Sequence, residues 1–264
     1  MVYCTDQLGR TIPINSPPKR IISVVPSQTE LLYDLGADAE VVGITRFCIH
    51  PDHWFRTKTR VGGTKKIDLE KIKLLQPDLI ICNKEENERE QIEKLMELYP
   101  VWVSDIKNLG DAVHMITSIG DLVDKKENAV KLVQKIKKEF KKLELNTPAV
   151  RTAYLIWNNP IMCAGADTFI DEMLGLCGFQ NIFSDSDSRY PEVKLQELSR
   201  MNPSLILLSS EPFPFREKHI REFQQACPNA NIKLVDGELF SWYGSRLQYA
   251  PEYLMNLLHS LSLS

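Results

Sequence analysis

The chain has 264 residues, of which 43% are hydrophobic and 25% are charged, and its formal net charge is −3 at pH 7. This balance argues against nucleic acid as the main partner, because phosphate binding needs a surplus of basic residues on one face. No run of about 18 apolar residues is present, so the sequence predicts no membrane span. The length allows two modest domains, each with its own core.

The N-terminal residues MVYCTDQLGR lack the apolar segment of a signal peptide. We therefore expect the chain as written to stay in the cytoplasm, whereas a trimmed sequence would allow a periplasmic protein. The cysteines show no CxxC spacing, which indicates reduced thiols rather than a disulfide framework. They are Cys4, Cys48, Cys82, Cys163, Cys177 and Cys227.

The first part of the chain alternates short apolar runs with amphipathic segments, which is typical of parallel βαβ units. Residues 20–25 are a predicted strand, and the helix that follows opens at Pro26 and ends at Gly36. Ser27 or Thr29 is a candidate cap for that helix. Further strands are predicted at 41–44, 79–82 and 101–103, with helices at 68–75 and 86–98.

One fourteen-residue pattern occurs twice. Residues 68–81 read DLEKIKLLQPDLII, and residues 194–207 read KLQELSRMNPSLIL. Each copy predicts a short helix that must end before Pro77 or Pro203, because proline excludes the preceding residue from helical geometry. An apolar run typical of a buried strand follows. The repetition predicts two similar lobes with a ligand cleft between them.

Between the two copies lies a segment with a strong helical period. Ala129, Ile136, Phe140 and their neighbours share one face, with lysines opposite. This predicts one helix over 126–143, of about 27 Å at 1.5 Å per residue. We divide the chain into an N-terminal lobe (1–108), a bridging helical segment (109–149) and a C-terminal lobe (150–264). The C-terminal lobe has predicted strands at 153–157, 205–208 and 232–235 and helices at 168–176, 194–201, 216–226 and 246–260.

Three stretches carry a family resemblance: DQLGRTIPINSPPKRIISVVPSQTELLYDLGA near the N-terminus, DLEKIKLLQPDLII, and GLCGFQNIF. With the bridging helix between the lobes, they resemble the helical-backbone (class III) substrate-binding proteins of ABC importers for cobalamin, iron-siderophores and haem. The resemblance implies an α/β fold of two Rossmann-like lobes joined by one long backbone helix. It implies a non-catalytic monomer that binds a corrinoid, haem or ferric siderophore as ligand, with no intrinsic cofactor.

Ligands of doubly wound lobes contact the loops at the carboxyl ends of the strands. In this chain those loops are rich in aromatic residues, Arg, Asn and Ser, which suit stacking on a macrocycle and hydrogen bonding to its amides or carboxylates. The candidate ligand-binding residues are Ser27, Gln28, Arg46, Phe47, Trp157, Asn158, Phe240, Trp242, Tyr243 and Arg246.

Several of these candidates have a second interpretation. Trp242 and Tyr243 would pack against a neighbouring helix if they belonged to the core, and Trp157 could equally be a core residue. Arg246 could pair with a ligand carboxylate or with Glu252. An apo structure whose own side chains fill the cleft would favour a third interpretation, an interaction protein that has lost its ligand.

The segment from Cys48 to His53 invites a metal-site interpretation, since Cys and His at short spacing can share a metal. No second cluster completes such a site, so we predict no protein-only metal site. The resemblance also implies that Glu70 docks on the permease of an ABC importer. In the second copy of the repeat the aligned residue is Gln196, with Glu197 beside it.

An enzyme alternative is a cytoplasmic tetrapyrrole chelatase, which would need a His and a carboxylate facing each other. His50 or His53 and Glu211 are the candidates for those roles. No nucleophile elbow, HExxH, Walker loop or GxGxxG motif is present, and a binding protein is the preferred interpretation.

Overall fold

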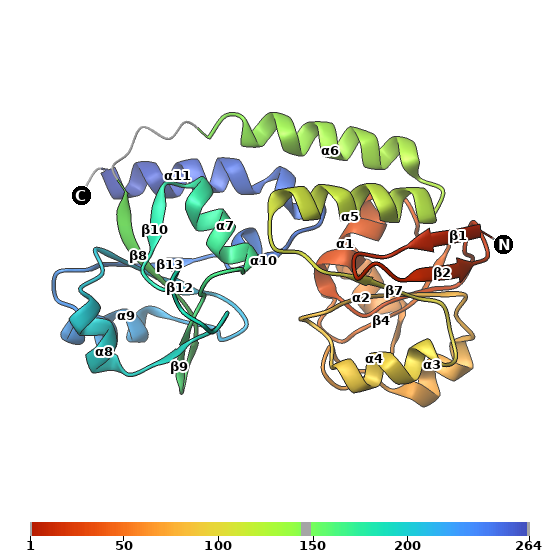
Figure 1. Cartoon of the computed structure of the whole chain (residues 1–264), viewed down its shortest axis with the longest axis horizontal. Coiled ribbons are helices and arrows are strands. Elements are labelled where there is room, and N and C mark those ends of the chain that lie inside the picture. Colours follow the sequence, from red (N-terminus) through yellow and green to blue (C-terminus); the bar gives the residue numbers. More distant parts are fainter. Residues whose placement is uncertain (1, 144–148, 263–264) are drawn as a thin grey trace. The chain divides into compact units, whose positions relative to one another are not determined.

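The computed structural model describes residues 2–143 and 149–262, which form an α/β fold with two compact units. Unit 1 consists of Met1–Ile106, Gly110–Lys137 and Tyr243–Gln248, and unit 2 of Lys107–Leu109, Lys138–Trp242 and Tyr249–Ser264. The chain therefore passes between the units more than once. Figure 1 follows these passages from red to blue.

Unit 1 is built on a five-stranded sheet in the order β5-β4-β3-β6-β7, and every neighbouring pair is parallel. This confirms the parallel βαβ arrangement predicted from the sequence. The strands are β3 (Ile21–Ser23), β4 (Val41–Ile44), β5 (Thr59–Arg60), β6 (Leu79–Asn83) and β7 (Val101–Ser104).

Two helices of unit 1, α3 and α4, bury apolar residues against this sheet. Ile72 of α3 and Leu95 of α4 pack with Ile22 and Ile80 of the central strands, and α3 and α4 lie together along one side of the sheet (Figure 1). The helices are α1 (Pro26–Asp34), α2 (Asp52–Thr57), α3 (Leu69–Leu75), α4 (Arg89–Met96), α5 (Leu109–Leu122) and α6 (Lys126–Phe140).

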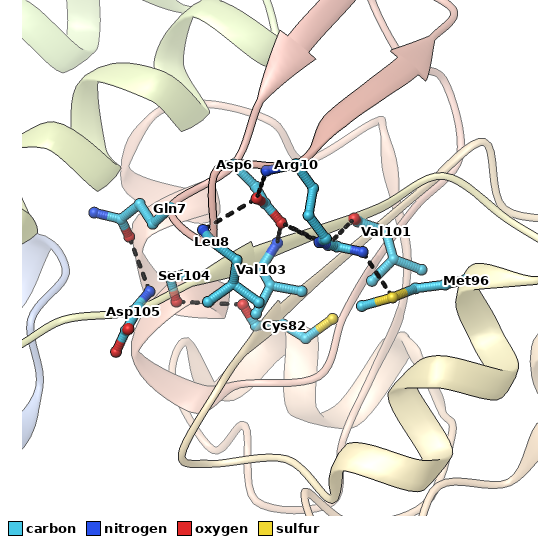
Figure 2. A network of polar contacts seen from close by, with 10 residues as sticks. All are labelled: Asp6, Gln7, Leu8, Arg10, Cys82, Met96, Val101, Val103, Ser104 and Asp105. Carbon is cyan, nitrogen blue, oxygen red and sulfur yellow. Dashed lines mark hydrogen bonds and ion pairs between the residues drawn. The ribbon is translucent and has the colours of Figure 1, made fainter.

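An antiparallel hairpin of β1 (Val2–Thr5) and β2 (Thr11–Ile14) opens the chain, and the DQLGR stretch forms its turn. The buried carboxylate of Asp6 accepts hydrogen bonds from the backbone N–H groups of Leu8, Arg10 and Val103. Arg10 returns to Asp6 through Nε at 3.0 Å and Nη2 at 2.5 Å, and Nη2 also reaches the carbonyl oxygen of Val101 (Figure 2). This network joins the hairpin turn to β7.

Unit 2 contains a six-stranded mixed sheet. Its path is β11-β9-β8-β12-β13, with β10 also paired to β8. β8, β10, β12 and β13 are parallel, whereas β9 and β11 are antiparallel additions that the sequence analysis did not predict. The strands are β8 (Val150–Asn158), β9 (Ile161–Cys163), β10 (Phe179–Asn181), β11 (Glu192–Val193), β12 (Leu205–Ser209) and β13 (Asn231–Val235).

The helices of unit 2 complete its core. Leu198 of α8 and Phe223 of α9 pack with Ala153 and Ile206 of the central strands. The helical segments are α7 (Phe169–Leu176), α8 (Leu195–Met201), α9 (Glu217–Ala226), α10 (Glu238–Ser241) and α11 (Ala250–Ser262); the 3-10 turn η1 (Ser245–Gln248), which belongs to unit 1, lies between the last two.

The internal repeat has the same local structure in both units. α3 ends at Gln76 and α8 at Asn202, both in the left-handed conformation, with φ of 45° and 48°. In unit 1 the side chain of Arg20 donates to the carbonyl oxygen of Leu75, the last residue of α3. In unit 2 Arg151 donates in the same way to the last residue of α8, at 2.8 Å. The helix-proline-strand prediction is confirmed in both copies.

The predicted cap of α1 is wrong. Its N-cap is Val25, no side chain caps it, and Pro26 occupies the first turn. Proline suits this position because its missing N–H would have no helical acceptor. Thr29 instead donates to the carbonyl oxygen of Val25, while Gly36 ends the helix at φ +84° as predicted.

α6 follows the predicted helical face. Ala129, Ile136 and Phe140 are buried, and the lysines of the opposite face are exposed. The residues up to Lys137 belong to unit 1 and those from Lys138 to unit 2. The predicted stop at Asn146-Thr147-Pro148 lies outside the described residues. Within residues 2–143 and 149–262, no helix is both long and apolar enough to cross a bilayer.

Candidate ligand-binding site

In unit 1 the carboxyl ends of β3, β4, β6 and β7 share one edge of the sheet, because these strands are parallel. A buried polar network lies along that edge. Gln28 of α1 donates to the Oγ atom of Ser104 at 2.5 Å, and Asn83 donates to the same oxygen at 2.9 Å. Three strand-end loops are therefore joined through one serine hydroxyl.

Asn87 ties this network to the backbone after β3 and to one further loop, which holds Thr64. Its Oδ1 accepts from the backbone N–H of Asn83, and its Nδ2 donates to the carbonyl oxygens of Val24 and Thr64 at 3.2 and 3.0 Å. Sequence reasoning did not nominate Ser104 or Asn87. Both residues lie at or just after the end of an apolar strand, and this position could have suggested them. Many residues without a binding role occupy the same kind of position.

Arg46 and Phe47 form the exposed part of the same edge. They follow β4, and the guanidinium of Arg46 lies 5.0 Å from the centroid of the Phe47 ring, while 49% of Phe47 is exposed. Gly63 lies beneath the pair, since a Cβ atom there would come within 3.0 Å of the ring and 3.3 Å of the guanidinium. The pair therefore presents a flat face and a positive charge to solvent.

Ser27 and Gln28, by contrast, are buried. Within the described part of the chain, Oγ of Ser27, Oε1 of Gln28 and Oγ of Ser245 have no hydrogen-bond partner. Gly244 packs directly on this region, since a Cβ atom there would lie 2.5 Å from the carbonyl oxygen of Ser27. A buried polar atom without a partner costs free energy, so these oxygens are candidate contacts for a bound polar group.

Arg246 pairs with Glu30 of α1, a partner that the sequence analysis did not name. Its Nη2 and Nε donate to the two carboxylate oxygens at 2.6 and 3.0 Å. Both side chains are mostly buried. Burial raises the pKa of Glu30 even though the hydrogen bonds from Arg246 oppose that shift. The pair uses Nε and Nη2 of Arg246, the atoms with which Arg10 pairs with Asp6.

In unit 2 the indole of Trp157 lies near the end of β8 and is 38% exposed. Its Nε1 donates to the carbonyl oxygen of Asn159 at 3.0 Å, and its ring meets Phe213 edge to face, with the centroids 5.7 Å apart. Asn158, the last residue of β8, is half-buried. The exposed fraction of Trp157 leaves one part of the indole available for stacking.

Trp242 is held inside unit 2 by Glu211. Only 7% of Trp242 is exposed, and its Nε1 donates to Oε1 of Glu211 at 2.8 Å. The hydroxyl of Ser241 donates to the same oxygen at 2.8 Å. Burial raises the pKa of Glu211, with Glu238 and Asp236 adding to the rise and the two hydrogen bonds opposing it.

The other two aromatic candidates are also packed. Phe240 is fully buried, with its centroid 5.0 Å from that of Tyr154, and Tyr243 is buried within unit 1. All three aromatic side chains of residues 240–243 are therefore buried. The exposed rings among the candidates are Phe47 and Trp157.

The Cys48–His53 segment has no metal-site geometry. Cys48 is buried, its sulfur lies 3.1 Å from the hydroxyls of both Thr29 and Thr45, and burial raises the pKa of its thiol. Across residues 2–143 and 149–262, no three His, Cys, Asp or Glu side chains are grouped so that they could hold a metal ion.

A family model described as periplasmic binding protein matches residues 21–228. This span contains both copies of the repeat and most of both sheets. The chain belongs to the periplasmic binding protein family. Its relatives are solute-binding proteins and not enzymes, which supports the binding interpretation over the chelatase alternative.

Relatives agree on the fold and differ in ligand. The chain is 26% identical over 251 residues to the vitamin B12-binding protein of Pectobacterium carotovorum, covering 93% of this chain and 90% of the relative. The crystal structure of the periplasmic vitamin B12-binding protein of Vibrio cholerae is 25% identical with a TM-score of 0.78, covering 94% of this chain and 99% of that one. The molybdate-bound periplasmic protein of Haemophilus influenzae has a TM-score of 0.81 at 16% identity, covering 99% and 91%.

Proposed function

We propose that the chain is the substrate-binding protein of an ABC-type importer and that its ligand is a metal chelate of the corrinoid, haem or ferric-siderophore class. Family membership supports the binding role. The relatives named for vitamin B12 support a corrinoid as the first ligand to test.

One observation carries the choice of ligand class. Among the candidate residues, the side chains that remain exposed at the strand ends are the Arg46–Phe47 pair in unit 1 and Trp157 in unit 2. Exposed aromatic faces suit stacking on a large flat ligand, and they add little to the binding of a small inorganic oxyanion. A guanidinium stacked on the phenyl ring can also meet an amide or carboxylate of that ligand.

Calorimetric titration with cyanocobalamin, haemin and a ferric catecholate tests this proposal, with molybdate as the matched small oxyanion. We expect saturable binding of one chelate at micromolar concentration or below, and none of molybdate. Binding of molybdate alone would contradict the chelate class. Binding of none of the four would favour the interaction protein that has lost its ligand.

The Arg46–Phe47 pair has a close structural match elsewhere in unit 1 that serves as a control. Arg60 lies 5.1 Å from the centroid of Phe55, much as Arg46 lies over Phe47. Phe55 belongs to α2 rather than to a strand-end loop. Phe47→Ala is expected to weaken chelate binding at least tenfold, or about 1.4 kcal/mol, while Phe55→Ala leaves it unchanged.

We further propose that the first turns of α3 and α8 contact the permease. Glu70 lies in the first turn of α3, is exposed, and pairs with Lys73 at 2.8 Å. Glu197 lies in the first turn of α8 and is exposed. Glu197 is one residue further along its helix than Glu70, which rotates it by about 100° around the helix axis. Charge reversal at Glu70 should abolish import with ligand affinity unchanged; import at the native rate would contradict this docking role.

The compartment follows from the importer role. A receptor of this kind meets its permease outside the inner membrane, and the similar solved proteins of Vibrio cholerae and Haemophilus influenzae are periplasmic. We therefore place the function there, as a monomer, while the cytoplasmic location expected from the N-terminal residues stays a prediction. Fractionation of cells that make the protein from its full gene separates the two compartments.

A further inference from the structure

A pocket in unit 1 lies beside the hairpin turn and α4 and has a volume of about 320 Å³. None of the unit 1 candidates for the chelate lines it; these are Ser27, Gln28, Arg46, Phe47, Tyr243 and Arg246. Asn83 and Asn87 of the strand-end polar network do line it. One face of α4 forms a wall, since Arg89, Ile92, Glu93 and Met96 recur at helical spacing along it. The pocket is within the size range of small-molecule sites.

The floor of this pocket is apolar and partly open. Ile92 and Val103 are buried, and Met96 is half-buried. Leu8, at the tip of the hairpin turn, also lines the pocket and is 40% exposed. An apolar group of a ligand that covered Leu8 and Met96 would be removed from water, which is favourable.

Arg10 supplies a charged donor that the protein satisfies poorly. Its Nε and Nη2 donate to Asp6, and Nη2 also donates to the carbonyl oxygen of Val101. Its Nη1 points to the sulfur of Met96, at 2.7 Å (Figure 2). A thioether is a weak acceptor for a guanidinium. In the part of the chain that the structure describes, no oxygen acceptor is recorded for Nη1.

Arg89 supplies a second cation that can change partner. It pairs with Glu93 at 2.7 Å, with the two side chains 88% and 54% exposed. An ion pair this exposed contributes little to stability, so Arg89 can turn toward a ligand at low cost. The lining carries three cationic side chains, and each is paired with a carboxylate: Arg10 with Asp6, Lys84 with Asp105, and Arg89 with Glu93.

We propose that this pocket binds a small organic monoanion with an apolar body, such as a medium-chain carboxylate, independently of the metal chelate. The carboxylate accepts from Nη1 of Arg10 and from Arg89, in charge-assisted hydrogen bonds. The apolar body lies on Leu8, Ile92 and Met96. A cationic ligand would be repelled by the Arg10 guanidinium, and a neutral ligand would form a weaker hydrogen bond with its Nη1 than a carboxylate does.

Methyl-detected NMR titration of the full chain tests this proposal, because Leu, Ile, Met and Val methyl groups line the pocket. The probes are hexanoate, acetate and hexan-1-ol, each added without any chelate. We expect saturable shifts of the Leu8, Ile92 and Met96 methyl signals with hexanoate in the millimolar range or below. Acetate lacks the apolar body and hexan-1-ol lacks the charge, so both should bind at least tenfold more weakly.

Two substitutions, each with a control, test the roles of Arg89 and of Nη1 of Arg10 separately. Arg89→Gln should weaken hexanoate about tenfold, as expected for one charge-assisted hydrogen bond. Arg56→Gln is the matched control, because Arg56 forms the same kind of exposed pair with Asp52 on α2, at 2.9 Å. Met96→Glu supplies an internal acceptor for Nη1 of Arg10 and should abolish binding, while Met96→Leu keeps the apolar shape and should retain it.

Saturable hexanoate binding that Arg89→Gln weakens and Arg56→Gln leaves unchanged supports the proposal, whether or not any chelate binds. Three results would overturn it: no saturable methyl shifts up to tens of millimolar, equal binding of acetate and hexanoate, or unchanged binding in Met96→Glu.

Discussion

Arg246 donates two hydrogen bonds to the carboxylate of Glu30, which lies 216 residues earlier in the chain, at 2.6 and 3.0 Å. The pair fixes the 3-10 turn η1 on α1 within unit 1, where Gly244 and the buried Leu247 also pack. The residues on either side of this segment, Trp242 and Tyr249, belong to unit 2. The pair therefore anchors the short C-terminal segment Tyr243–Gln248 to unit 1.

Removing the Glu30 charge should destabilise unit 1. Glu30→Gln leaves a mostly buried guanidinium without its counter-ion, and we expect a loss of about 3 kcal/mol in the free energy of unfolding. Urea unfolding measures this value. The double variant Glu30→Gln, Arg246→Met should recover most of the loss, because the buried charge is then absent. A single variant as stable as the native chain would contradict the structural role of the pair.

Glu211 should give unit 2 a pH-dependent stability. Burial raises its pKa above the ordinary value of 4.5, so the folded chain binds the proton more tightly than the unfolded chain. This contribution is present at acid pH and is lost as the pH rises through the raised pKa. In Glu211→Gln the side-chain oxygen still accepts from Ser241 and Trp242 but does not titrate.

The stability of the native chain relative to Glu211→Gln is therefore expected to rise as the pH is lowered from neutral toward the ordinary pKa of 4.5. Urea midpoints of the two proteins at matched pH values give the comparison. Parallel curves, or a relative gain toward alkaline pH, would show that the raised pKa is wrong.

The Asp6–Arg10 network should be a major stabilising feature of the hairpin. Asp6→Asn removes a fully buried charge from Arg10, with an expected loss of about 3 kcal/mol. Asp52→Asn is the control, because its pair with Arg56 is exposed and should contribute less than about 1 kcal/mol. Urea unfolding followed through the buried Trp102, which precedes Val103 of the network, measures both. Equal losses of unfolding free energy in Asp6→Asn and Asp52→Asn would contradict the larger contribution assigned to the buried pair.

The repeated helix ends predict a stabilising change. Gln76 and Asn202 hold φ of 45° and 48°, where glycine has no steric penalty. Gln76→Gly should stabilise the chain by about 0.5–1 kcal/mol, and Asn202→Gly by less, because asparagine tolerates this region. At the end of α4, Glu97 has φ of −68°, so Glu97→Gly should destabilise. Destabilisation by Gln76→Gly would contradict the left-handed cap.

Much of the fold was predictable because its signals are local. Pro77 and Pro203 end their helices and precede buried strands, and Gly36 stops α1, as their backbone restrictions require. The antiparallel β9 and β11 were not predicted, since each has two or three residues and no distinctive period. The start of α1 was predicted wrongly. Ser27 and Thr29 were both plausible N-caps, but the helix begins at Pro26, before either of them, and no side chain caps it.

The site was less predictable because long-range partners decide which side chains are exposed. Nothing near Trp242 in the sequence indicates that Glu211, 31 residues away, accepts from its indole. Arg246 had a plausible near partner in Glu252, whereas its partner Glu30 lies 216 residues away in the sequence. Phe47 and Trp157 were nominated by their place after or near the end of a strand, and the structure adds that these two rings are the exposed ones.

Tryptophan fluorescence during chelate titration tests the central claim most directly. Trp54 and Trp102 are fully buried and Trp242 is nearly so, which leaves Trp157 as the exposed indole of the described chain. We expect saturable quenching by one chelate that is largely lost in Trp157→Phe and retained in Trp242→Phe. Loss of quenching in Trp242→Phe with retention in Trp157→Phe would contradict the assignment and return the site to the 240–243 aromatics.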